Sequence, residues 1–254
     1  MNRIKTLLAV VAALIACGGT QARTLEEIKK EGKIIIATEG AYPPFNYFQG
    51  SALTGFEIEL GEAMAKKMGV KLEWKALSFD ALLAGLRYDR WDVVIAGVTV
   101  TEERAKAVTF TDPHWCSGGV VVSKDPAMKN AKDLAGKIVA VQTGTTYLDN
   151  AKKIAGIKEV RNFPQDTDAR SAVINNRADA WVADKFVAKI ALDANPSAGL
   201  KMGDLLWVER NAPVIAKGNA ALLKALNQAL AEVQADGSYA AISQKYLKED
   251  IRCH

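Results

Sequence analysis

The sequence predicts an exported α/β protein with two similar α/β units. Three observations predict it: short β-branched runs alternate with segments of helical period, one short pattern occurs in each half, and a basic, apolar leader opens the chain. Of the 254 residues, 24% are charged and 49% hydrophobic, which excludes a disordered tail, a collagen-like repeat or a disulfide-packed miniprotein. At about 100–200 residues per domain, the length allows one large domain or two modest ones.

The charge balance argues against nucleic acid as a partner. The formal net charge is +4, and no stretch collects enough Lys and Arg to form a basic groove.

The leader predicts export. Residues 1–5 carry two positive charges, and residues 6–16 are apolar apart from Thr6. This run is too short to cross a bilayer, which takes about 20 apolar residues, so we expect a signal peptide over 1–22 and a periplasmic protein. The alternative is a lipobox at 14–17, which would make Cys17 a lipidated first residue.

Two cysteines remain, Cys116 and Cys253. In an exported protein two cysteines are more often paired than free, so a Cys116–Cys253 disulfide is favoured over two free thiols. Neither lies in a metal-ligand spacing, and with two His residues in the chain we expect no metal and no cofactor.

The first half starts with the β-branched run Lys33–Thr38, a buried strand that Pro43 and Pro44 cannot continue. After Gly55 a helical face runs until Gly69. The other elements expected in this half are a strand over 71–76, a helix over 78–88 capped by Ser78, and a strand over 92–96.

The second half repeats this alternation. The expected strands cover 137–141, 158–163 and 179–182, and the expected helices cover 144–155, 166–175, 184–194, 220–235 and 238–247.

The pattern shared by the two halves is Arg, one residue, Asp and an apolar strand, at 90–96 and at 177–183. In open α/β sheets, ligands bind beyond the carboxyl ends of strands. Two such sheet edges facing each other would form a cleft, where we expect the ligand.

The known catalytic templates are missing from the sequence, including the nucleophile elbow, the zinc-protease helix, the P-loop and the dinucleotide-binding glycine motif. His114, beside Pro113 and Trp115, is expected to be a packed ring, and His254 is terminal.

One segment is suited to binding a carboxylate. Thr101 is a plausible cap for a short helix, and Arg104 lies one turn inside it. A guanidinium can bind a carboxylate with two parallel hydrogen bonds, which Thr99 and a backbone amide near Gly97 could complete. The alternative is that Arg104 is a solvated surface charge.

Two further segments have equally simple alternatives. A helix is expected to start at Gly144, Thr145 and Thr146, and its free amides would attract an anion. The alternative is that Thr145 or Thr146 only caps this helix. Asp184 ends a strand and would pair with an ammonium, or it only caps the next helix.

Three residues could shape the rest of a pocket. Tyr42 and Phe79 are candidate apolar walls, although each alone is equally suited to a core. Glu39 follows the first strand, where a carboxylate without a partner would be costly to bury.

The order and spacing of these segments resemble the bacterial periplasmic solute-binding proteins for polar amino acids, the binding components of ABC importers. The resemblance covers about 24–247. It is carried by residues 38–45 (TEGAYPPF), 55–60 (GFEIEL), 78–82 (SFDAL), 98–104, 110–113 (FTDP), 142–146 (QTGTT) and 177–184. It implies a two-lobed periplasmic-binding-protein fold of type II topology with two hinge strands. The implied lobes are 24–115 with 212–254, and 120–207.

The resemblance also implies roles for the candidate residues. Arg104, Thr99, Gly97, Gly144, Thr145 and Thr146 would bind the ligand α-carboxylate, Asp184 the α-ammonium, Tyr42 and Phe79 would be aromatic walls, and Glu39 an acidic position. Glu57 and Glu59 stand where the family usually has aspartates, a departure that we interpret as structural. The family pattern assigns no role to Cys116.

The function expected from this resemblance is capture of a free L-amino acid by hinge closure and its delivery to an ABC permease, by a monomer. Glu39 favours a basic side chain such as Arg, Lys, ornithine or His. Glutamine or another polar amino acid is the alternative ligand, and a periplasmic cyclohexadienyl dehydratase is the alternative activity.

Overall fold

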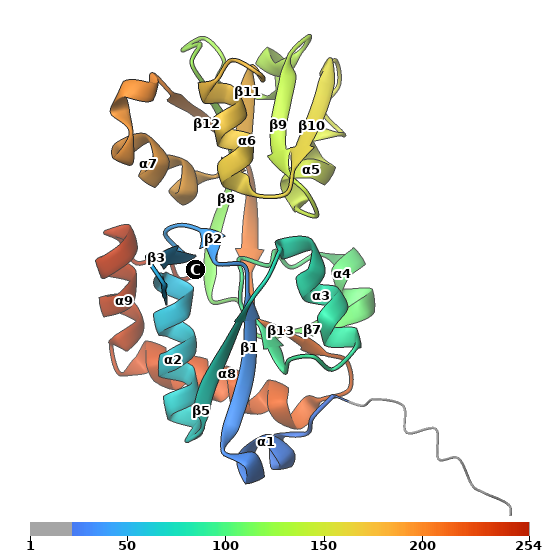
Figure 1. Cartoon of the computed structure of the whole chain (residues 1–254), viewed down its shortest axis with the longest axis vertical. Coiled ribbons are helices and arrows are strands. Elements are labelled where there is room, and N and C mark those ends of the chain that lie inside the picture. Colours follow the sequence, from blue (N-terminus) through green and yellow to red (C-terminus); the bar gives the residue numbers. More distant parts are fainter. Residues whose placement is uncertain (1–21, 254) are drawn as a thin grey trace, which may run out of the picture.

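The protein folds into two stacked α/β lobes joined by two long strands (Figure 1). This computed structural model describes residues 22–253. The expected signal peptide, apart from Ala22, and the alternative lipobox at Cys17 lie outside the described residues. Within residues 22–253 no helix combines the length and the apolar character needed to cross a membrane.

The first lobe contains a sheet in the order β5-β1-β6-β13-β7, in which β1 is parallel to β5 and β6. Its strands are β1 (Lys33–Thr38), β5 (Lys71–Ala76), β6 (Val93–Val94), β7 (Val108–Phe110) and β13 (Val214–Ala216). A small second sheet contains β2 (Ala41–Tyr42), β3 (Asn46–Gln49) and β4 (Ala52–Thr54). The helices are α1 (Leu25–Glu31), α2 (Phe56–Met68), α3 (Phe79–Arg87), α4 (Glu102–Ala107), α8 (Ala220–Ala235) and α9 (Ser238–Leu247).

The second lobe contains a sheet in the order β10-β9-β11-β8-β12. Its strands are β8 (Trp115–Ser123), β9 (Ile138–Gln142), β10 (Glu159–Phe163), β11 (Ala180–Asp184) and β12 (Lys201–Asn211). Its helices are α5 (Thr146–Ala151), α6 (Asp166–Ile174) and α7 (Lys185–Ala194), with short 3₁₀ helices at Ala131–Leu134 and Pro196–Ala198.

Strands β8 and β12 connect the lobes. They pair antiparallel from Lys201 opposite Ser123 to Asn211 opposite Trp115, and their paired ends reach the first lobe (Figure 1). Since Thr99 of the first lobe forms a bridge with Asn211, this end of β12 is anchored to that lobe.

Three local predictions differ from the structure. The helix expected over 144–155 is only α5, Thr146–Ala151, which Thr145 caps. The strand expected over 92–96 is only β6, Val93–Val94, although the amides of Asp92 and Ile95 also donate to β1 carbonyls. Ser78 makes no capping hydrogen bond with its side chain, so that part of the prediction was wrong.

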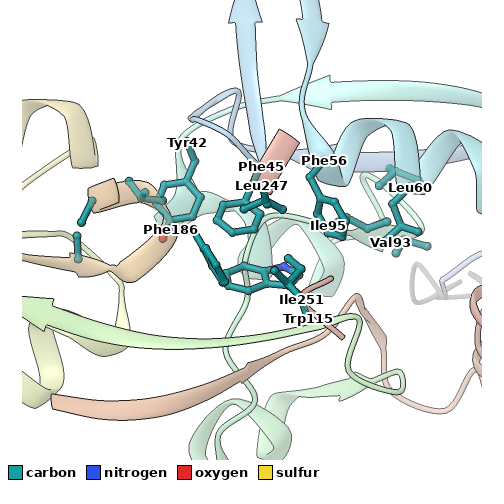
Figure 2. Packing of buried hydrophobic residues seen from close by; sticks show 14 of the residues in the cluster. Tyr42, Phe45, Phe56, Leu60, Val93, Ile95, Trp115, Phe186, Leu247 and Ile251 are labelled. Atoms are coloured by element: carbon teal, nitrogen blue, oxygen red, sulfur yellow. The ribbon is translucent and has the colours of Figure 1, made fainter. Parts of the chain in front are cut away.

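An aromatic stack lies where β8 leaves the first lobe (Figure 2). Phe45 stacks on Trp115, with ring centroids 4.1 Å apart and planes 13° from parallel, and Tyr42 lies on Phe45 at 5.7 Å. Phe186 of α7 meets the edge of Phe45 at 6.4 Å. Because Phe186 belongs to the second lobe, buried aromatic packing extends from one lobe into the other.

The end of the chain is tied to β8. Cys116 and Cys253 form a disulfide between residues 137 apart in sequence. The Cys116 amide also donates to the Ile251 carbonyl at 3.1 Å, so the segment after α9 is held against the connecting strand.

We predict that the double variant Cys116→Ala/Cys253→Ala loses about 2–4 kcal/mol of unfolding free energy, because the disulfide restricts a long loop in the unfolded chain. Equilibrium urea unfolding of the oxidised wild type and the variant measures this difference. Wild type in reductant is the control and should unfold at the variant's midpoint. A variant as stable as the oxidised wild type would contradict the prediction.

Candidate functional site

A cavity of about 270 Å³, a volume that includes space open to solvent, lies between the two lobes. Its lining residues follow strand ends and helix starts of both lobes: Glu39, Tyr42, Phe79, Ala96, Gly97, Thr99, Arg104, Gln142, Thr145, Thr146 and Tyr147. The carboxyl ends of β1 and β9 both open onto it, as expected for ligand sites in α/β sheets. The structure therefore brings together eight of the ten candidate residues, and leaves Gly144 and Asp184 outside the lining.

Arg104 lies in the cavity wall and contacts both lobes. Its Nη1 donates to the Thr99 carbonyl at 2.9 Å, and its Nη2 donates to the Gly144 carbonyl at 3.0 Å. The guanidinium lies 5.8 Å from the centre of the Phe79 ring. Burial lowers the pKa of Arg104, while Glu209 acts in the opposite direction. A guanidinium has five N–H donors, so these two bonds leave others for a ligand.

Glu39 lies beyond the end of β1 and is only 7% exposed. Its Oε1 accepts a 2.6 Å hydrogen bond from Nε2 of Gln142, which lies on the other lobe. Burial raises the pKa of Glu39 to about 8, the Gln142 bond lowers it, and the carboxylates of Asp166 and Asp80 raise it further. The carboxyl group therefore binds its proton more tightly than an exposed glutamate does, and a nearby positive charge would favour its ionised form.

Gly97 lines the cavity, but its amide is not free. It donates to Oε1 of Glu57 at 2.8 Å, so the amide expected to help bind a ligand carboxylate is already occupied. Gly97 has a φ of 60°, and an added Cβ would lie 3.3 Å from the Tyr42 ring. Both the backbone conformation and the tight contact favour glycine here.

Thr145 caps helix α5, as the alternative to a ligand contact predicted. Its Oγ1 accepts the Leu148 amide as the cap of α5, and its hydroxyl donates to the Gln142 carbonyl at 2.7 Å. Thr146 differs, because its hydroxyl donates at 2.5 Å to Glu209 of β12. Gly144 contributes its carbonyl to Arg104 and does not reach the cavity.

Asp184 is not among the residues that line the cavity, and its ion pair with a ligand ammonium stays a prediction. It is completely buried, and its Oδ1 accepts the amides of Phe186 and Val187 as the cap of α7. Burial raises the pKa of Asp184 to about 7, while the nearby Ser117 hydroxyl and the two amides lower it. Oδ1 therefore caps the helix, whereas Oδ2 is buried without a hydrogen-bond partner among the described residues.

Three residues near the cavity were missed by the sequence reasoning: Gln142, Tyr147 and Glu209. Gln142 is the first residue of the 142–146 segment, of which only the glycine and two threonines were named as ligand contacts, and Tyr147 follows that segment. Glu209 is 5% exposed on β12, a strand for which no sequence range was predicted. In the structure Glu209 points to the buried face of β12, between the exposed residues Val208 and Arg210. Without a predicted strand here, the sequence did not indicate that Glu209 is buried.

Beneath the cavity, Glu57 of α2 forms a buried polar cluster. Its Oε1 accepts Nε2 of His114 at 2.8 Å, Nε1 of Trp115 at 3.0 Å and the Gly97 amide, while its Oε2 accepts Nδ2 of Asn46 at 2.8 Å. Burial acts to raise the pKa of Glu57, but the bonds from His114, Trp115 and Gly97 outweigh it and hold the pKa below its usual value.

His114 is a packed ring, as the sequence suggested. Its Nδ1 lies 2.8 Å from the Asn211 carbonyl and its Nε2 lies 2.8 Å from Glu57. The two ring nitrogens therefore connect the Asn211 carbonyl to the Glu57 carboxyl group. The pair lies completely buried between α2 and the two connecting strands.

Comparison with known proteins identifies the family. The model of the bacterial extracellular solute-binding proteins, family 3, matches residues 34–249. The L-cystine-binding protein TcyJ of Escherichia coli (strain K12) is 34% identical over 248 residues, which cover 96% of this chain and 93% of TcyJ.

Solved structures agree with the fold. An ancestral arginine-binding protein bound to arginine has a TM-score of 0.81 and 38% identity, over 85% of this chain and 98% of that chain. The ancestral amino acid-binding protein AncCDT-1, a precursor of cyclohexadienyl dehydratase, has a TM-score of 0.81 and 32% identity, over 88% of this chain and 99% of that chain. The two-lobed periplasmic-binding-protein fold implied by the sequence is confirmed.

We predict that Glu57→Gln lowers the unfolding free energy by about 1–3 kcal/mol. The NH2 group of the glutamine replaces an oxygen that accepts hydrogen bonds, so at least one buried donor loses its acceptor. Thermal and urea unfolding measure the loss. Glu59→Gln on the same helix is the matched control: Glu59 bonds Lys245 and Tyr246 near the surface, and its change should be about 0–1 kcal/mol. Equal effects of the two variants would show that the cluster does not stabilise the fold.

Proposed function

The chain belongs to the bacterial extracellular solute-binding proteins, family 3, and we propose that it binds one free L-amino acid between its lobes for delivery to an ABC importer. The observation that carries this proposal is a cavity lined from both lobes that contains a guanidinium, Arg104, and a separate carboxyl group, Glu39. An amino acid with a cationic side chain carries charges complementary to both groups.

Arg104 is the proposed partner of the α-carboxylate. The guanidinium already bonds the Thr99 and Gly144 carbonyls, which fix its plane at the cavity wall. A carboxylate is a stronger acceptor than a carbonyl, and a guanidinium binds it with two parallel bonds. The stacked position near Phe79 keeps solvent away from one side of this pair.

Hinge closure is the proposed mechanism. Bonds from Arg104 to Gly144 and from Gln142 to Glu39 cross between the lobes in this closed arrangement. A ligand that contacts both lobes binds the closed form better than the open form, and this difference in affinity drives closure. A micromolar dissociation constant corresponds to about 8 kcal/mol, within the reach of one buried ion pair and an aromatic wall.

Glu39 supports a ligand with a positive charge at the far end of its side chain, such as arginine, lysine, ornithine or histidine. The relative TcyJ is named for L-cystine, whose second ammonium group would meet the same requirement, and several relatives are named for arginine. Glutamine is the alternative, since Gln142 and a protonated Glu39 could bind a neutral amide.

Binding without catalysis is proposed over the dehydratase alternative, because the structural neighbour AncCDT-1 is itself described as an amino acid-binding protein. Export to the periplasm by the 1–22 leader and a monomeric state are part of the same proposal.

A thermal-shift screen of the wild type against the protein amino acids, L-cystine and prephenate tests the function, since tight binding to the native form raises the melting temperature. We expect a basic amino acid to give the largest shift, and Arg104→Ala to weaken its binding at least about 100-fold with the fold intact. Lys106→Ala, exposed on the same helix and paired with Glu103, is the control and should bind normally. Near-native affinity in Arg104→Ala would refute the proposal that Arg104 binds the ligand α-carboxylate. Turnover of prephenate would show that the protein is an enzyme and would overturn the proposal of binding without catalysis.

The raised pKa of Glu39 makes cation binding dependent on pH. Below about pH 8 the empty site holds a proton that a cationic ligand must displace, so arginine affinity should rise as pH increases to about 8 and then level off. Calorimetry in buffers of different ionisation enthalpy measures the released proton. In Glu39→Gln, arginine should bind more weakly and release no proton from this group, while glutamine should be little affected. Equal losses for arginine and glutamine would reject this role.

A further inference from the structure

The Arg-x-Asp pattern that the two halves share places a carboxylate just before two equivalent strands. Oδ2 of Asp92 accepts the Ile35 amide of β1 at 2.7 Å, and Oδ2 of Asp179 accepts the Ile138 amide of β9 at 2.7 Å. The two residues differ in burial, since Asp92 is only 6% exposed and Asp179 lies at the surface. A buried carboxylate needs a partner, so the first lobe contains one that the second lobe does not need.

That partner is Arg23. Its Nε donates to Oδ1 of Asp92 at 2.9 Å and its Nη2 donates to Oδ2, so the guanidinium binds the carboxylate at two points. Its Nη1 pairs with Glu31 at the end of α1. Nδ2 of Asn219, the cap of α8, donates to the Arg23 carbonyl at 2.8 Å. Arg23 therefore joins α1, the sheet and α8, and α1 lies at the end of the first lobe opposite the second lobe (Figure 1).

Arg23 is also the residue that follows the predicted leader, 1–22. A peptidase that hydrolyses the Ala22–Arg23 bond consumes one water. The water oxygen ends on the Ala22 carboxylate, and both water hydrogens end on the Arg23 nitrogen, which becomes an ammonium group below about pH 8. Cleavage therefore converts an uncharged amide with one N–H into a cation with three N–H donors.

A carboxyl oxygen without a partner lies in the cavity beside this bond. Ala22 and Asp89 line the same cavity of the first lobe, about 660 Å³ including space open to solvent. Oδ2 of Asp89 is buried and has no hydrogen-bond partner in the part of the chain that the structure describes. Arg87 and Lys217 also line this cavity, yet neither bonds that oxygen. An ammonium group at Arg23 would bring both a donor and the opposite charge.

We propose that the Ala22–Arg23 bond is the processing site, and that the ammonium group created by cleavage binds Asp89 and becomes part of the first lobe. This inference rests on the proposed export of the chain and does not depend on the ligand. Cleavage before Cys17 would leave Arg23 inside the chain with an amide nitrogen, which carries no positive charge for Asp89. The first lobe therefore gains this bond only after the leader is removed.

The first experiment determines the start of the full chain after export by a bacterial host, by intact mass and amino-terminal sequencing. We expect the chain to begin at Arg23. A lipidated Cys17, or any other first residue, would overturn the processing site. A chain that stays unprocessed inside the cell would instead reject the proposed export, and this inference with it.

The second experiment measures what the free amino group contributes. Chains that begin at Arg23, or that retain Gln21 and Ala22 before it, are released from a cleavable fusion and compared by urea unfolding near neutral pH. We expect the extended chain to have a folding equilibrium constant about tenfold smaller, and this difference to disappear in Asp89→Asn. Asparagine tolerates the positive φ of 53° at this position. Asp193→Asn, exposed near the end of α7, is the control and should keep the difference.

The pH dependence separates charge pairing from a steric effect of the extension. Pairing with Asp89 raises the pKa of the amino group in the folded chain, so its stabilisation is complete below the ordinary value of about 8 and is lost as pH rises through the raised pKa. Arg87 and Lys217 face the same cavity in both chains, so their effect cancels in the comparison. Equal stability of the two chains, a difference that is the same at every pH, or one that persists in Asp89→Asn would overturn the bond to Asp89.

Discussion

The site depends on one buried carboxylate, Glu57, whose four hydrogen bonds join segments that are far apart in sequence. Through Asn46, whose Oδ1 accepts the Gly40 amide, it holds the loop after β1, and through Gly97 it holds the cavity floor. Through His114 and Trp115 it fixes the start of β8. A buried charge without partners is very unfavourable, so these segments must meet correctly for the fold to form.

The contact between the lobes is mostly polar around the cavity and aromatic beside it. Arg104 bonds the Gly144 carbonyl, and Gln142 bonds Glu39, across the gap. Bonds of this kind exchange readily for bonds to water or to a ligand, so each contributes little net free energy. The closed arrangement can therefore respond to what lies between the lobes, whereas the Phe45–Trp115 stack at the base of β8 keeps their connection packed.

Three buried carboxyl groups lie in or near the cavity: Glu39 lines it, whereas Asp166 and Asp184 lie outside the lining. Burial raises the pKa of Glu39 to about 8 and those of Asp166 and Asp184 to about 7, and Asp166 accepts Nε1 of Trp181 at 2.9 Å. Arg104 is the cation in the lining itself.

The secondary structure and most of the cavity residues could be predicted from the sequence, because both depend on patterns of a few neighbouring residues. Buried β-branched runs predicted the strands, glycines predicted helix ends, and Thr101 predicted the start of α4. Glu39 after β1, and Thr99 and Arg104 after β6, reach the same cavity. Residues whose role depends on a distant partner left no such pattern. The direction of the Thr99 and Thr146 hydroxyls depends on Glu209, which lies 110 and 63 residues away, and the fate of the Gly97 amide depends on Glu57, 40 residues away. The tertiary structure determines these hydrogen-bond partners, because it brings distant groups together and excludes the water that would otherwise bond to them.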